Sequence, residues 1–105
     1  MQRIGPSALR DWLTGDDAPA LIDVREPWEA AICELPQARQ VPMSALPSAS
    51  SELPSEGPVV VICHVGMRSA MVAQWLEASG VSDVYNLAGG LDAWAREVDP
   101  EMATY

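Results

Sequence analysis

The chain lacks lysine and phenylalanine altogether, and it has only one histidine and two cysteines among its 105 residues. Six arginines stand against fifteen acidic residues, so the formal net charge is −9. Such an excess of acid repels phosphate backbones and anionic lipids, which argues against binding to nucleic acid or to a membrane surface. One histidine and two separated cysteines provide neither a zinc ligand set nor a disulfide framework. We therefore expect no metal and no organic cofactor.

Long hydrophobic runs are also missing. No stretch of about 18 apolar residues is present, so we expect no membrane span. Residues 1–6 lack the apolar core of a secretory signal, and a cytoplasmic location is the default expectation. Hydrophobic residues nevertheless make up 49% of the sequence, which is enough to bury a real interior. The length predicts one domain over residues 1–105.

Short apolar strands alternate with short helices along the chain. This pattern predicts an α/β fold with a central, mainly parallel sheet flanked by helices on both faces. The all-apolar run Val59–Ile62 is typical of a central strand. We expect the other strands at residues 20–22, 40–41 and 84–85, and one short helix plus a surface loop between residues 43 and 58. Helices are expected from Gly5-Pro6, from Glu26, from Ser69 and from about Leu91 to Val98. In the helix from Ser69, Met71, Val72, Trp75 and Leu76 are expected to face inward.

Chemistry is expected where the central strand ends. Cys63 opens a loop that leads into a helix, and such a loop directs backbone N–H groups and the positive end of the helix dipole inward. Helix N-termini and neighbouring cations favour the thiolate form of a cysteine. Gly66 allows the backbone to curl, and Arg68 adds a cation. The pattern predicts an electropositive pocket in which Cys63 is open to solvent and carries a negative charge.

Three motifs in this order resemble the rhodanese homology domain over about residues 4–100. They are Asp-Val-Arg-Glu at residues 23–26, Cys63 followed by Arg68-Ser69, and Tyr-Asn-Leu-Ala-Gly-Gly-Leu-Asp-Ala-Trp at residues 85–94. The resemblance implies a sulfurtransferase in which Cys63 is catalytic. Cys63 would take sulfur from thiosulfate or a persulfide donor, become a persulfide, and pass the sulfur to a thiol or to cyanide. The resemblance also implies that the loop residues His64, Val65, Gly66, Met67 and Arg68 bind the substrate and that Asp23, Arg25 and Ser69 support the loop.

Alternatives remain open at this point. The protein would act as a sulfur carrier if it exchanged sulfur with a protein partner in a relay. An interaction module without catalysis is a further alternative. Among relatives of this fold, the six-residue loop 63–68 is associated with sulfur, whereas a seven-residue loop is associated with phosphatases. For Asp23 and Arg25 the simpler interpretation is an ion pair that fixes the loop. The donor, the acceptor, the pathway, the oligomeric state and the roles of Cys33 and His64 are not predicted.

Overall fold

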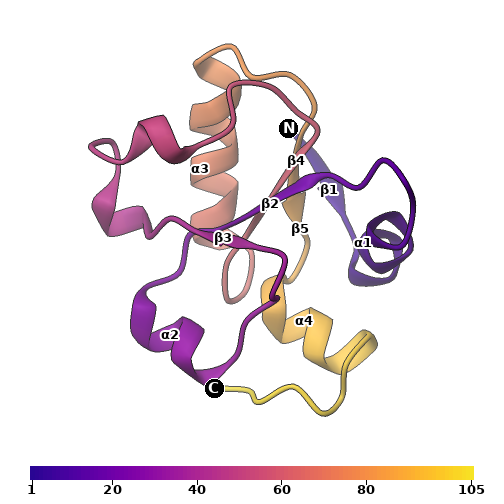
Figure 1. Cartoon of the computed structure of the whole chain (residues 1–105). Coiled ribbons are helices and arrows are strands. Elements are labelled where there is room, and N and C mark those ends of the chain that lie inside the picture. The colour runs from indigo at the N-terminus through magenta and orange to yellow at the C-terminus, as the bar shows by residue number, and fades with distance from the viewer.

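The computed structural model describes residues 1–105 (Figure 1). The strands and helices follow the chain in the order β1 (Gln2–Ile4), α1 (Pro6–Leu13), β2 (Ala20–Asp23), α2 (Pro27–Ile32), β3 (Arg39–Gln40), β4 (Val59–Ile62), α3 (Met67–Ala78), β5 (Val84–Leu87) and α4 (Gly90–Glu97). Two 3₁₀ turns, Met43–Ala45 and Ser50–Glu52, lie between β3 and β4. None of the helices combines the length and hydrophobicity that crossing a bilayer demands.

The five strands form one parallel sheet in the order β1-β5-β4-β2-β3. β4 lies at its centre, and all four of its residues are fully buried. Both observations confirm the expectation for Val59–Ile62. Because all strands are parallel, the ends of β2, β4 and β5 come to the same edge of the sheet, where the loops that follow them meet.

Helices cover both faces of this sheet, as predicted. Alternate residues of a strand point to opposite faces, so Val59 and Val61 face one way while Val60 and Ile62 face the other. The first pair belongs to a core cluster that α3 completes; the second pair belongs to a cluster that α1 and α4 complete. Figure 1 shows α3 on one side of the sheet and α1 with α4 on the other. The helix residues of these two clusters are Val72, Ala73 and Leu76, and Leu9, Leu91 and Trp94, respectively.

Three features differ from the sequence-based expectation. β1 was not predicted, because only Ile4 in it is strongly apolar and the strand lies at the edge of the sheet beside β5. The segment between residues 43 and 58 contains two 3₁₀ turns rather than one helix. The inward orientation of Met71 and Trp75 was wrong, since their exposed fractions are 59% and 37%.

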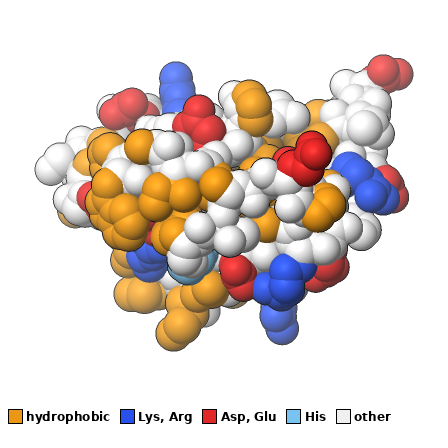
Figure 2. Space-filling view, turned by 90° about the horizontal axis from the view of Figure 1, so that it is seen from below, with side chains coloured by type: hydrophobic (Ala, Val, Ile, Leu, Met, Phe, Trp, Pro, Cys, Tyr) orange, Lys and Arg blue, Asp and Glu red, His pale blue; other side chains and the backbone are white.

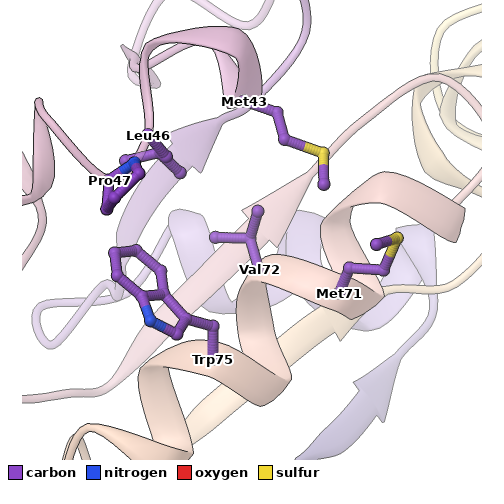
Figure 3. Close-up of a pocket in the computed structure, with 6 residues that line it drawn as sticks. All are labelled: Met43, Leu46, Pro47, Met71, Val72 and Trp75. Atoms are coloured by element: carbon purple, nitrogen blue, oxygen red, sulfur yellow. The ribbon is translucent and has the colours of Figure 1, made fainter.

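The reason for the third difference lies in how α3 sits on the sheet. Its buried residues include Ser69, Val72 and Leu76, which leaves Met71 and Trp75 on a lateral face. There they line an apolar groove of about 340 Å³ together with Val72 and the segment after β3. Figure 3 shows the side chains of Met43, Leu46 and Pro47 across the groove from those of α3. α3 is therefore hydrophobic on more than its buried face.

The start of α4 is held directly against the loop that follows β4. The backbone N–H of Leu91 donates to the carbonyl oxygen of Cys63 at 2.9 Å, and that of Asp92 donates to the carbonyl oxygen of His64 at 3.0 Å. Gly90 permits this approach because its φ is +61° and because a Cβ there would overlap both carbonyl groups. Gly90 thus allows the start of α4 to pack against the backbone of the loop that precedes α3.

Gly90→Ala tests this close approach. We expect it to lower the free energy of unfolding by about 3 kcal/mol or more, because left-handed backbone strain and steric overlap add up. Gly80→Ala is the matched control: Gly80 also has a positive φ, +100°, but a Cβ there meets no atom within 4 Å. It should cost only about 1 to 2 kcal/mol. Urea unfolding of both variants measures the difference, and equal losses would contradict the packing described here.

Candidate active site

The loop 63–68 lies between the end of β4 and the start of α3, at the lower side of the molecule in Figure 1. Gly66 caps α3 in the left-handed conformation, with φ of +99°, and turns the chain back over Cys63. The sulfur of Cys63 accepts a hydrogen bond from the N–H of Gly66 at 3.1 Å. The predicted amide dipole therefore faces the sulfur, and it does so at the positive end of a twelve-residue helix.

Solvent access at Cys63 differs from the expectation. The residue is only 1% exposed, whereas the sequence predicted a side chain open to solvent. The sulfur lies beneath the loop, between the Gly66 amide and the hydroxyl of Ser69 at 3.2 Å. Solvent therefore reaches only a very small part of this residue. Two loop residues, Val65 and Met67, are 49% and 74% exposed and provide the rim of this region.

Ser69 and Asn86 form a hydrogen-bonded bracket behind the sulfur. The side-chain amide of Asn86 donates to the carbonyl oxygen of Gly66 at 3.0 Å, which turns its own oxygen toward Ser69. Ser69 donates to that oxygen at 2.5 Å. The lone pairs of Ser69 then face Cys63 and accept from its S–H, while the Gly66 N–H faces the sulfur in either protonation state. Because Asn86 holds the carbonyl group of Gly66, it also fixes the direction in which the Gly66 N–H points, which is toward the Cys63 sulfur.

Arg68 is held by an ion pair rather than directed freely into the loop. Its two terminal nitrogens donate to both carboxylate oxygens of Glu29 at 2.6 and 2.7 Å. Glu29 lies in the first turn of α2, is 3% exposed, and also accepts from the backbone N–H of Glu26 in a capping box. The Arg68 hydrogen bonds, opposed by burial, hold the pKa of Glu29 at about 2. Arg68 is thus a fixed cation, as expected, but its charge is balanced by a carboxylate that the sequence analysis did not identify.

Asp23 and Arg25 form the ion pair that the simpler interpretation predicted. The guanidinium of Arg25 is fully buried and donates to Asp23 at 2.7 Å and to the carbonyl oxygen of Cys33 at 2.7 Å. It also approaches the sulfur of Cys33 at 3.8 Å. The pair lies at the end of β2, whose Asp23 is in register with Ile62, the residue before Cys63. It therefore stabilises the strand that adjoins the loop without contacting the sulfur of Cys63.

The C-terminal residue Tyr105 joins these two ion pairs. Its hydroxyl donates to Glu29 at 2.7 Å and accepts from Arg25 at 3.1 Å. Its ring stacks on His64 with a centroid distance of 4.0 Å and an interplanar angle of 13°. The edge of Trp28, which is 62% exposed, completes a small aromatic cluster beside the loop.

Three residues of the site were missed from the sequence. Asn86 carried a usable signal, because it is a polar residue inside an apolar strand. Glu29 carried a weaker one, since Glu26 and Glu29 have the spacing of a capping box around Pro27. Tyr105 carried none, because it is eighty residues from Arg25 and no periodic pattern includes it.

The face around the loop is mixed in character. Figure 2, which views the molecule from the side of the loops, shows hydrophobic side chains gathered on one part of this face and charged side chains spread over the rest. No group of three or more His, Cys, Asp or Glu side chains is arranged to hold a metal ion. The arrangement instead offers one sulfur nucleophile with a donor N–H and a hydroxyl beside it, which is suited to covalent catalysis.

Comparison with protein families matches residues 5–97 to the rhodanese-like domain. A sulfurtransferase of Allochromatium vinosum is 36% identical over 103 residues, and the match covers 98% of this chain and 96% of that protein. The probable adenylyltransferase/sulfurtransferase MoeZ of Mycobacterium tuberculosis is 38% identical over 104 residues, which are 97% of this chain but 26% of that protein.

Solved structures agree with the sequence comparisons. The crystal structure of a rhodanese-like domain protein from Staphylococcus aureus superposes with a TM-score of 0.82 at 29% identity, covering 100% of this chain and 99% of that one. The chain spans about a quarter to a third of the length of the first curated relatives that it matches, so those relatives contain further segments.

The Arg68–Glu29 pair predicts a specific pH dependence of stability. The folded pKa of Glu29, about 2, lies below its ordinary value of 4.5. Its contribution is therefore fully present above about pH 4.5 and is lost as the pH falls toward 2, and it amounts to about 3 kcal/mol. Glu29→Gln should lower the free energy of unfolding at pH 7 and flatten its decline between pH 5 and pH 2. Exposed Glu97→Gln is the control and should keep the wild-type slope; an unchanged slope in Glu29→Gln would contradict the pairing.

Proposed function

The chain belongs to the rhodanese-like domain family, and from this premise we propose that it is a sulfurtransferase that carries sulfur as a persulfide on Cys63. The observation that carries the proposal is the Cys63 sulfur at the N-terminus of α3, facing the N–H of Gly66 at 3.1 Å. A hydrogen bond to this sulfur stabilises negative charge on it, both as a thiolate and as a persulfide. The relatives include proteins named as sulfurtransferases, which supports the same class of reaction.

The reaction proceeds in two displacements on sulfur. With thiosulfate, the Cys63 thiolate attacks the outer sulfur, a new sulfur–sulfur bond forms, and sulfite leaves with the electron pair of the bond that breaks. The acceptor, a thiol or cyanide, then attacks the outer sulfur of the persulfide. Thiocyanate or an acceptor persulfide leaves, and the Cys63 thiolate is restored. No metal or organic cofactor enters either step.

The loop residues have distinct roles in this proposal. Gly66 supplies the hydrogen bond to sulfur, and Ser69 with Asn86 fixes the orientation of Gly66. His64, Val65 and Met67 form the rim that the donor passes. Arg68 shapes the loop through Glu29 and contributes its charge at short range. Asp23 and Arg25 stabilise the neighbouring strand end.

A protein relay is a second candidate, and one specific observation favours it. Val65, Met67 and Met71 are about half to three-quarters exposed and lie together beside the active loop. Exposed apolar patches of this kind mark protein-binding surfaces in many proteins. The proposal keeps the cytoplasmic setting expected from the sequence, where thiols are kept reduced and serve as acceptors. The relay predicts slow turnover with thiosulfate and with small persulfides, whereas a free-standing enzyme predicts fast turnover with at least one of them.

Thiocyanate formation from thiosulfate and cyanide tests the proposal. Cys63→Ser should lower the rate by about 100-fold or more, because hydroxyl oxygen is a far poorer nucleophile toward sulfur than a thiolate. Cys33→Ser should retain most of the activity. Mass spectrometry of the wild type after donor exposure should show the mass of one added sulfur atom on the Cys63 peptide, removed by cyanide. Full activity in Cys63→Ser, or sulfur found only on Cys33, would refute the mechanism.

A further inference from the structure

The hydroxyl of Tyr105 occupies an unusual position, because it bonds at once to two buried and oppositely charged groups. It donates to Glu29, which is 3% exposed, and accepts from Arg25, which is fully buried. Burial raises the pKa of Tyr105 to about 12, so the hydroxyl keeps its proton at neutral pH and remains a donor. The guanidinium of Arg25 also donates to the backbone carbonyl oxygen of Glu29 at 3.3 Å, so the two ion pairs and the Tyr105 hydroxyl form one connected network.

We propose that Tyr105 is a positioning residue for sulfur transfer: it sets the charge that Arg68 presents to Cys63 and holds His64 in place at the loop. The inference rests on the proposed function, because sulfur transfer at Cys63 is the reaction that Tyr105 would affect. The contacts of Tyr105 described above do not depend on that function. Tyr105 does not contact the sulfur. It acts through Glu29 on one side and through the stacked ring of His64 on the other.

The electrostatic effect of Tyr105 on Arg68 arises because both residues donate to the same carboxylate oxygen of Glu29. Glu29 Oε2 accepts from both Arg68 and Tyr105, at 2.7 Å in each case. A hydrogen bond from the phenol withdraws negative charge from Glu29, so less of the Arg68 charge is neutralised. Arg68 lies in the first turn of α3, and the Cys63 sulfur lies at the N-terminus of the same helix beside Gly66. The phenol therefore favours the thiolate of Cys63 indirectly, and its removal disfavours it.

The steric step concerns His64, the residue next to Cys63. The Tyr105 ring lies on the His64 ring at 4.0 Å, and the segment that carries it covers a small space lined by Cys33, His64 and Leu91. With its backbone carbonyl bonded to Asp92 and its ring covered by Tyr105, His64 is held on two sides. The charged and titratable groups around this corner are Asp23, Arg25, Glu29, Cys33, His64, Arg68, Asp92 and Tyr105.

Two substitutions separate the two steps. Tyr105→Phe deletes the hydroxyl and retains the ring, while Tyr105→Leu deletes both. We expect Tyr105→Phe to lower the maximal rate of transfer from thiosulfate to cyanide by about three- to tenfold, with KM nearly unchanged. The effect is smaller than the full strength of a hydrogen bond to a charged group, because the hydroxyl acts on Cys63 only through Glu29 and Arg68. Tyr105→Leu should lose more. Tyr85→Phe is the control, since Tyr85 packs on Trp12 away from the loop and should behave as wild type.

A second experiment tests the role of Tyr105 without any sulfur donor. It measures the rate at which iodoacetamide alkylates Cys63 at different pH values, by mass spectrometry of the Cys63 peptide. Tyr105→Phe should move the midpoint of the rate profile upward by about half a pH unit, whereas Tyr85→Phe should not move it. This result supports the inference even if thiosulfate is not a donor. Circular dichroism checks that each variant is folded. A folded Tyr105→Phe with the wild-type alkylation profile would overturn the inference, as would an equal shift in Tyr85→Phe.

Discussion

The ion pair between Arg68 and Glu29 is the interaction on which the geometry of the active loop depends. It joins the first turn of α3 to the first turn of α2, and both helices start at the edge where the parallel strands end. A buried carboxylate without a partner would be strongly unfavourable, so the pair holds both helix starts in one relative position. The loop between β4 and α3 has little freedom left once Arg68 at one end and the braced carbonyl of Cys63 at the other are fixed.

This pairing changes the source of the positive potential at Cys63. Asp23 with Arg25 and Glu29 with Arg68 form two charge-balanced pairs beside the loop, although the chain as a whole carries −9. A negative charge on the Cys63 sulfur is then stabilised mainly by the Gly66 N–H and by the N-terminus of α3. Arg68 adds only the part of its positive charge that Glu29 does not neutralise. The burial of Cys63 strengthens each of these interactions, since solvent screens them less.

Much of the fold was predictable from local patterns, whereas the partners within the site were not. The run Val59–Ile62 identified the central strand because a strand buried on both faces needs apolar residues throughout. The position of Cys63 after it was enough to predict that backbone N–H groups of the loop face inward, but not that the N–H of Gly66 is the one that donates to the sulfur. Arg68 meets Glu29, and Glu29 meets Tyr105, only through tertiary contacts, and local sequence does not encode these. Met71 and Trp75 were misplaced because α3 has apolar residues on two faces, so periodicity alone did not select the buried one.

The hydrogen bond from Gly66 to Cys63 is the central claim, and amide NMR measures it directly. The ¹H–¹⁵N resonance of Gly66 should move downfield as Cys63 ionises, because the bond becomes charge-assisted. The same titration of Cys63→Ser should leave the Gly66 resonance in place. A Gly66 resonance that stays fixed in the wild type while Cys63 ionises would contradict the account.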